Sequence, residues 1–449
     1  MSFSDPNNFL LSSDSKNIQA AIDLSVKEGH GHVVIPACNK RTGEHIWIID
    51  ETIKLPSHIC VEIDNAHLRM AEGVMCRMFE NENADLEIGK TAAGLQEDIT
   101  IQGRGNAILD GGKHNGLRED THNKNGLPNI FHNITIYLHN VRNFKIDGLI
   151  ISDQRFWAVT FMFSSYGAVS NIHFEITDKA WRKGHPLNPE HPWRNQDGID
   201  LRVGCHDIEL FNITGETGDD TIALTALAEK GKKPDRYEDM YYCHHLSPDI
   251  YNVSIRNVKA FNNHCAVVRL LCHFGIKLYN ISMDDIWDAT PDENPIAVAD
   301  GQRTACCVKI GENAYFGNDP EQCCKHGQMR NIKINNIYSS GLSAVNMNCT
   351  VCDVEIHNIQ VGEKGIHAVS ASFITSGRHN ALDKDSNITR LENVLVDGVL
   401  WNSKQPDAVP FFFNNLLAKN VRIINVSANC EKLVESCQVR SDSEAVIWS

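Results

Sequence analysis

One short phrase recurs along this chain of 449 residues and limits the folds that the chain can adopt. Each copy begins with Asn or Asp, continues as apolar–x–apolar, and has Asn or Gly five residues after its start, as in residues 143–148 (Asn-Phe-Lys-Ile-Asp-Gly). Clear copies begin at positions 98, 143, 207, 252, 331, 353, 393 and 420, and weaker copies begin at Asn171 and Gly275. Apolar alternation with β-branched residues predicts a strand, and the polar residue at each end predicts a turn.

The spacing of these copies indicates a coil. The shortest separations between successive copies are 22 to 28 residues, which suits one bare turn made of three short strands. A sandwich would show hairpin signals at much shorter intervals, and βαβ units would show long amphipathic helices. The sequence therefore predicts an all-β fold, a single-stranded right-handed parallel β-helix of about ten coils, in which the longer separations contain inserted loops. We expect the repeated Asn to stack at one corner and to bond backbone groups that the turn leaves open.

The two ends of the chain differ from this repeat. Residues 17–27 have helical spacing and are followed by Gly29, Gly31 and a strand-like segment. Such a helix can cap the open end of a solenoid, where a bare strand edge would promote aggregation. We expect one domain over residues 1–449. It comprises a cap with the first strands (1–60), the β-helix coils (61–430) and a tail without the repeat (431–449).

Composition argues against several classes of function. The net charge of −15, from 42 basic and 57 acidic residues, disfavours a general nucleic-acid binder but permits a local basic cleft for an anionic sugar. No stretch approaches the ~20 apolar residues of a membrane span, and no secretory signal is visible, so we expect a cytoplasmic protein without a membrane partner. The 15 cysteines are then expected as reduced thiols. Their spacing is not a standard zinc pattern and no nucleotide fingerprint is present, so neither a metal nor a cofactor is expected.

Two acidic segments of similar design carry the candidate chemistry. Asp197 lies in Asn-Gln-Asp-Gly-Ile-Asp-Leu, and Asp219 and Asp220 lie in Gly-Asp-Asp-Thr-Ile-Ala-Leu. With a coil period near 23 residues, these aspartates fall on adjacent coils, and His264 and Lys309 fall at comparable places on the next two. Crowded carboxylates repel, so one is held protonated and can donate a proton while its neighbours stay ionised. Glycosidic cleavage needs that division of roles.

Here the sequence resembles glycoside hydrolase family 28, the polygalacturonases, whose members are right-handed parallel β-helices. The resemblance extends from about residue 17 to the C-terminus. It rests on residues 108–112 (Ile-Leu-Asp-Gly-Gly), 155–159 (Arg-Phe-Trp-Ala-Val), 195–197 (Asn-Gln-Asp) and 218–220 (Gly-Asp-Asp). The resemblance implies that Asp219 is the general acid and that Asp197 and Asp220 activate the attacking water with inversion.

Other positions follow the family pattern only in part. By the resemblance, His264 is the assisting histidine, although its usual flanking glycines are replaced by Asn263 and Cys265. The family's Arg-Ile-Lys signature keeps its lysine as Lys309 but has Cys307 in place of the arginine.

Basic and aromatic residues near the acidic segments are candidates for binding the sugar. Aromatic faces stack on sugar C–H surfaces, and Arg or Lys can pair with a uronate. The alternative for this region is a solvated insertion with buried tryptophans. We assign substrate binding to Lys309, Arg269, Asn195, Trp157 and Arg194.

The sequence as a whole predicts an inverting glycoside hydrolase that acts on a short, uronic-acid-containing, pectin-derived oligosaccharide. We expect the carboxyl groups of Asp197 and Asp219 to lie about 6.5–9.5 Å apart. Long insertions flank the acidic segments in coil order and would close a groove into a pocket, which predicts exo-action. A polysaccharide lyase on the same scaffold is an alternative. It would need calcium or another charge neutraliser and a Lys, Arg or His base. A carbohydrate-binding β-helix without catalytic activity is a third.

Overall fold

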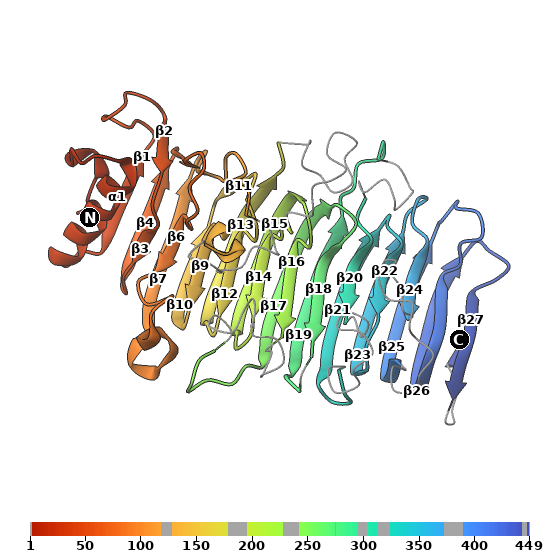
Figure 1. Ribbon diagram of the computed structural model, residues 1–449. Coiled ribbons are helices and arrows are strands. Elements are labelled where there is room, and N and C mark those ends of the chain that lie inside the picture. The colour runs from red at the N-terminus through yellow and green to blue at the C-terminus, as the bar shows by residue number, and fades with distance from the viewer. Residues whose placement is uncertain are drawn as a thin grey trace. The chain divides into compact units, whose positions relative to one another are not determined.

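The computed structural model describes residues 2–117, 128–177, 195–227, 242–273, 275–294, 303–311, 324–371, 389–441 and 447–448 (Figure 1). The chain divides into two compact units. Unit 1 consists of Met1–Gly218 with Lys233–Ser247, and unit 2 consists of Asp219–Lys232 with Pro248–Ser449. Within the described residues, no helix is both long enough and apolar enough to span a membrane.

Unit 1 is built from three ladders in which every strand pair is parallel. The first ladder contains β1 (His32–Pro36), β4 (Ile59–Asp64), β7 (Gln96–Arg104), β10 (Val141–Asp147), the start of β13 (Ser165–Glu175) and β15 (His206–Thr217). The second contains β2 (Ile46–Ile49), β5 (His67–Met70), β8 (Ile108–Asp110), β11 (Ile150–Ser152) and the end of β13. The third contains β3 (Ile53–Leu55), β6 (Phe79–Asn81), β9 (Ile136–His139), β12 (Val159–Met162) and β14 (Ile199–Arg202).

Unit 2 continues the same design with longer strands. One ladder contains β16 (Ile222–Ala226), β18 (Ala266–Cys272), β20 (Cys306–Ile310), β22 (Ser343–Met347) and β24 (His367–Ala371). The other contains β17 (Ile250–Asn262), β19 (Leu278–Asp288), β21 (Met329–Ser339), β23 (Val351–Val361) and β25 (Thr389–Trp401). Both ladders reach β26 (Phe411–Ala428), which also pairs with β27 (Val434–Ser441) and β28 (Ile447–Trp448).

The recurring phrase marks two corners of a coil. In every clear copy except the one that ends at Gly103, the first and last residues both adopt left-handed backbone angles, as at Asn331 (φ 53°) and Asn336 (φ 55°). Among residues other than Gly, Asn and Asp tolerate this conformation best, which explains why the phrase begins and ends with them. Between the corners its apolar residues are buried. The predicted parallel β-helix is confirmed.

Corner asparagines bond to one another along the stack. The Asn280 side-chain amide donates to Asn252 Oδ1 at 3.0 Å, and that of Asn331 donates to Asn280 Oδ1 at 2.6 Å. The Asn393 and Asn420 side chains extend a similar row, because Asn420 donates to Asn393 Oδ1 at 2.9 Å. The predicted stacking is therefore present. It joins side chain to side chain, whereas the sequence suggested bonds to open backbone groups.

The two weaker copies of the phrase are out of phase with the coils. Ser170 pairs with Phe211 and Ile172 with Ile213, so Asn171 is level with Asn212 and forms the second corner of its coil. The first corner of that coil is Tyr166, at φ 55°. In the other weak copy the first corner is Asn280, five residues after Gly275. Alternating apolar residues continue on both sides of each corner. The six-residue phrase can therefore match the segment before the first corner or the segment after the second corner, as well as the strand between them.

Stacked aliphatic side chains form the interior of unit 2. Val253 is level with Ile281, Ile281 with Ile332, and Ile332 with Val354 on successive strands, and each of these side chains is buried. Identical spacing of the strands brings similar side chains into direct contact, and this burial is the main source of stability in such coils.

The N-terminal helix covers one end of unit 1. Helix α1 (Asp14–Lys27) begins one turn earlier than the sequence suggested, with Ser13 as its N-cap, and it packs against β1, β2 and β3 (Figure 1). Its buried face contains Ile18, Ala21 and Ile22. Four short 3₁₀ helices, η1 (Pro6–Asn8), η2 (Glu87–Lys90), η3 (Ala92–Gly94) and η4 (Ile130–Asn133), are inserted between strands. The predicted N-terminal helix is confirmed.

The C-terminal residues continue the ladder. Beyond Cys430 the chain forms β27 and β28, both paired in parallel with β26, where the sequence suggested a tail without the repeat. The assignment of all 449 residues to a single domain remains a prediction.

Candidate active site

Asp197 lies in the turn that leads into β14 of unit 1. Neighbouring coils fix the backbone on both sides of it. The Ala158 amide donates to the Asp197 carbonyl at 3.0 Å, and the side-chain amides of Gln154 and Gln196 each donate to the other residue's carbonyl. Asn195, the first residue of the motif, has a left-handed φ of 47° and is half-buried. Asp197 is 4% exposed, so this turn holds its carboxylate in a largely dry position.

Trp157 is a core residue of the same unit. Its side chain is 2% exposed, its ring stacks on Phe156 with centroids 4.4 Å apart, and the Arg202 guanidinium lies 3.5 Å from the ring centroid. Arg202 Nη2 in turn lies 3.2 Å from Asp200 Oδ1, and Asp200 is fully buried. This arrangement agrees with the alternative of a buried tryptophan, and a sugar contact at Trp157 stays a prediction. Arg194, the other predicted wall residue, lies outside the described residues.

Asp219 and Asp220 precede β16 in unit 2 and are held by β18. One Asp220 oxygen, Oδ1, accepts the Ala266 amide at 2.8 Å, and the other, Oδ2, accepts Arg269 Nη1 at 3.1 Å. Asp219 Oδ1 accepts the Asp220 amide at 2.9 Å. Asp219 is 8% exposed and Asp220 is 3% exposed. The pair therefore consists of one carboxylate bound by a cation and an amide, next to a second carboxylate.

Two more predicted residues lie on the coils that follow. The His264 amide donates to the Arg303 carbonyl at 3.0 Å, and His264 has a left-handed φ of 67°. Lys309 is level with Arg269 on the adjacent strand β20, and neighbouring strands lie about 4.8 Å apart. The structure thus brings Asp219, Asp220 and Arg269 together and places Lys309 on the strand next to Arg269.

Cys265 is a neighbour that the sequence reasoning did not assign to the site. One carboxylate oxygen from each of Asp219 and Asp220 and the Cys265 sulfur all lie within 4.8 Å of one another. These are ligand types that zinc accepts, but acidic groups also gather without a metal, so proximity alone assigns no ion here. The register of β16 and β18 places Cys265 level with Asp219. From sequence this proximity was hidden by the long insertion between the two strands.

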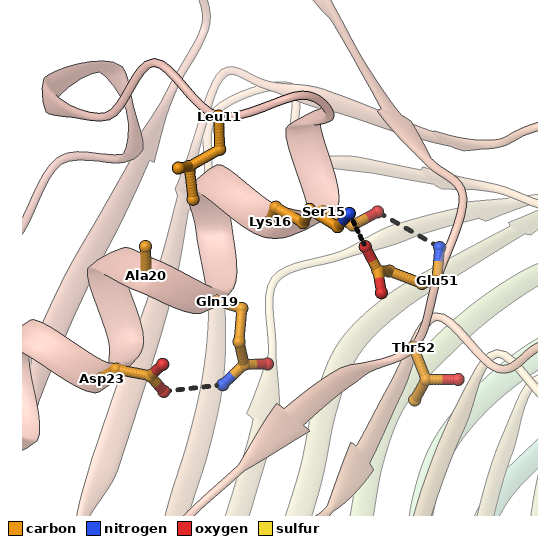
Figure 2. A pocket seen from close by; sticks show the side chains of 8 residues that line it. All are labelled: Leu11, Ser15, Lys16, Gln19, Ala20, Asp23, Glu51 and Thr52. Atoms are coloured by element: carbon orange, nitrogen blue, oxygen red, sulfur yellow. Dashed lines mark hydrogen bonds and ion pairs between the residues drawn. The ribbon is translucent and has the colours of Figure 1, made fainter.

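A hollow of about 210 Å³ lies elsewhere in unit 1, against helix α1. Figure 2 shows its lining, in which Lys16 reaches Glu51 and the Gln19 amide donates to Asp23. None of the residues that line it belongs to the predicted site. In the ladder β3–β6–β9–β12–β14, the hollow lies beside the first strand, because Glu51 and Thr52 precede β3. Asp197 precedes the last strand of this ladder, β14. This hollow is therefore separate from Asp197.

Comparison with known proteins bears on what this arrangement does. Residues 62–231 match the model of glycosyl hydrolases family 28, a range that contains Asp197, Asp219 and Asp220. The resemblance to family 28 is confirmed. No curated protein sequence matches the chain.

Several solved structures are similar in fold. A hyperthermoactive exopolygalacturonase from Thermotoga maritima has a TM-score of 0.54 at 12% identity, over 98% of this chain and 91% of that one. The tailspike protein of E. coli bacteriophage HK620 in complex with pentasaccharide has a TM-score of 0.52 at 12% identity, over 95% and 68%. PfbA, a surface adhesin of Streptococcus pneumoniae, has a TM-score of 0.50 at 12% identity, over 98% and 91%. At this identity the similarity concerns the fold alone.

Proposed function

We propose that this protein is an inverting glycoside hydrolase that acts on a short, pectin-derived oligosaccharide containing uronic acid. The observation that carries the proposal is the family 28 match, because the matched range contains all three candidate aspartates. The contacts of Asp219 and Asp220 support it, since they give two adjacent carboxyl groups different surroundings. Neighbouring carboxyl groups in different surroundings can take the roles of acid and base.

In the proposed mechanism, Asp219 protonates the oxygen of the leaving sugar. Asp220, together with Asp197, accepts hydrogen bonds from a water molecule and takes its proton as the water attacks the anomeric carbon from the opposite face. An inverting enzyme needs about 6.5–9.5 Å between acid and base so that water fits between them. Asp197 and Asp219 belong to different units, and their separation stays a prediction.

The proposed uronic acid needs a cation, and Lys309 is the best candidate. Arg269 is bonded to Asp220, so its charge is already engaged. Cys307, which stands where the family has arginine, is fully buried, its thiol donates to the Tyr338 carbonyl at 3.0 Å, and burial raises its pKa. That position therefore contributes no exposed group, and of these three residues Lys309 would pair with the sugar carboxylate.

We further propose exo-action and a cytoplasmic location. Exo-action rests on the long insertions that flank the acidic segments, between residues 98 and 143, 207 and 252, and 275 and 331. Parts of all three insertions lie outside the described residues. Time-resolved product analysis on a longer oligomer tests the mode of action. Release of one sugar at a time supports exo-action, and early mixed fragments of middle length contradict it.

A screen of product release from pectic, fructan and other oligosaccharides tests the function. On the substrate so found, Asp219→Asn should lower kcat by at least ~10²-fold with a much smaller change in KM, because general acid catalysis contributes on that scale. Asp292→Asn removes an exposed carboxylate of the same unit and serves as the matched control.

Two results would contradict the proposal. Full turnover by Asp219→Asn would remove the catalytic assignment. An unsaturated product that absorbs in the ultraviolet would instead indicate a lyase.

A further inference from the structure

Arg269 is unusual among the predicted substrate-binding residues because its charge is directed at an aspartate of the proposed catalytic set. Its Nη1 donates to Asp220 Oδ2 at 3.1 Å. The Arg269 side chain is 17% exposed and the Asp220 side chain 4%, so the pair is largely shielded from water. Bonds between charged partners in such surroundings are stronger and more directional than bonds at an open surface.

Strand β18 supplies both donors to Asp220. Ile222 is level with Val268 and Ala223 with Arg269, so β18 runs beside β16 and places the Ala266 amide against Asp220 Oδ1. Each carboxylate oxygen of Asp220 thus accepts one hydrogen bond, from an amide and from a guanidinium. Two bonds of this kind orient the carboxylate plane.

The geometry of the Arg269 contact is suited to fixing the orientation of Asp220. Other polar groups near the two aspartates include the Cys265 thiol and, on the next strand, Lys309. Among the described contacts of Asp220, the guanidinium of Arg269 is the charged donor, and it bonds to Oδ2 while the Ala266 amide bonds to Oδ1. A planar guanidinium holds a carboxylate in a defined direction better than a flexible ammonium does.

We propose that Arg269 is a positioning residue. It holds the Asp220 carboxylate in the orientation in which that group takes a proton from the attacking water, and it does not itself bind the sugar. This inference rests on the proposed hydrolase function. It also differs from the substrate-binding role that the sequence suggested for Arg269, because a positioning residue acts on kcat and a substrate ligand acts on KM.

Steady-state kinetics of Arg269→Gln on the substrate found by the screen separate the two roles. We expect kcat to fall by about 10²-fold while KM changes by less than about threefold. The Asp220→Asn/Arg269→Gln double variant should be no slower than Asp220→Asn alone, because Arg269 acts through Asp220. A raised KM with unchanged kcat would overturn the proposal, as would losses that multiply in the double variant.

Two further variants guard against a trivial loss of folding. Arg269→Lys retains a positive charge and should recover part of kcat, and a raised KM alone in this variant would equally overturn the proposal. Arg330→Gln is the matched control. Arg330 is a half-buried arginine of the same unit that lies 4.5 Å from the Tyr279 ring and should leave both constants unchanged. Full kcat in Arg269→Gln refutes this inference alone, whereas a wild-type protein that hydrolyses no oligosaccharide refutes the function with it.

Discussion

His139 should make the protein sensitive to mild acid. It lies on β9, its side chain is 1% exposed, and its ring centroid is 5.7 Å from that of Phe163. Burial lowers its pKa from 6.5 to about 4, because the interior disfavours the charged imidazolium. The backbone amide of His139 also donates to Asn81 Oδ1 at 2.8 Å, which fixes the strand at this point. The neutral ring is therefore part of the folded state.

The sign of the effect follows from the two pKa values. In the unfolded chain His139 binds a proton below about pH 6.5, whereas in the folded protein it binds one only near pH 4. The free energy of unfolding therefore falls as the pH drops from about 6.5 to about 4. A shift of about 2.5 pKa units corresponds to roughly 3.4 kcal/mol when fully expressed. At pH 4.5 the linkage relation gives a loss of about 2.5 kcal/mol relative to pH 7.5.

Urea unfolding of the wild type and of His139→Phe at pH 7.5 and pH 4.5 measures this contribution. The carboxylates titrate in both proteins, so the informative quantity is the difference between their two pH dependences. The variant keeps an aromatic ring and cannot be protonated, and it should lose about 2.5 kcal/mol less than the wild type between the two pH values. Equal pH dependence in the two proteins would refute the reasoning.

Three other changes test the corners and the site. Asn331→Ala removes the side-chain hydrogen bond to Asn280 and places alanine at φ 53°, so the free energy of unfolding should fall by about 1–2 kcal/mol in urea titrations. Asn331→Gly should lose less, because glycine adopts this backbone conformation without strain. Gly311→Ala should lower the melting temperature more than Asn331→Ala does, because Gly311 has a φ of +77° and the new Cβ would lie 2.1 Å from Cys349 Sγ. An unchanged melting temperature would show that the backbone at this corner can relax. Asp197→Asn should lower kcat by at least ~10²-fold with little change in KM, and an equal loss with a disturbed circular dichroism spectrum would point to a structural role instead.

Much of the fold could be predicted because the corners need a rare backbone conformation. Asn and Asp at positive φ recur with the coil period, so a six-residue phrase reports both the strand and its ends. The same reasoning failed at Tyr166, because this corner has neither Asn nor Asp. It also failed at Gly275, which the phrase marks as the first corner of a coil although that corner is Asn280, five residues later. Local sequence identifies a corner only when the corner uses a residue that favours it.

The site was less predictable than the fold because its contacts cross coils of unequal length. Asp220 and its partner Arg269 are 49 residues apart, and that distance includes an insertion whose length no motif reveals. For Asp197 and Asp220, which no long insertion separates, motif spacing predicts equivalent turns on adjacent coils, and this stays a prediction. Burial was also invisible at Trp157, because an aromatic residue in the turn before a strand can face the core or a ligand and the local sequence does not decide which.

The stereochemistry of the first product tests the central claim most directly. Proton NMR of the reaction mixture, recorded within the first minutes on the substrate identified by the screen, resolves the two anomers before they interconvert. An inverting hydrolase built on Asp197, Asp219 and Asp220 predicts that the anomer opposite to the cleaved linkage appears first and then equilibrates. Initial release of the retained anomer, or of an unsaturated sugar, would contradict it.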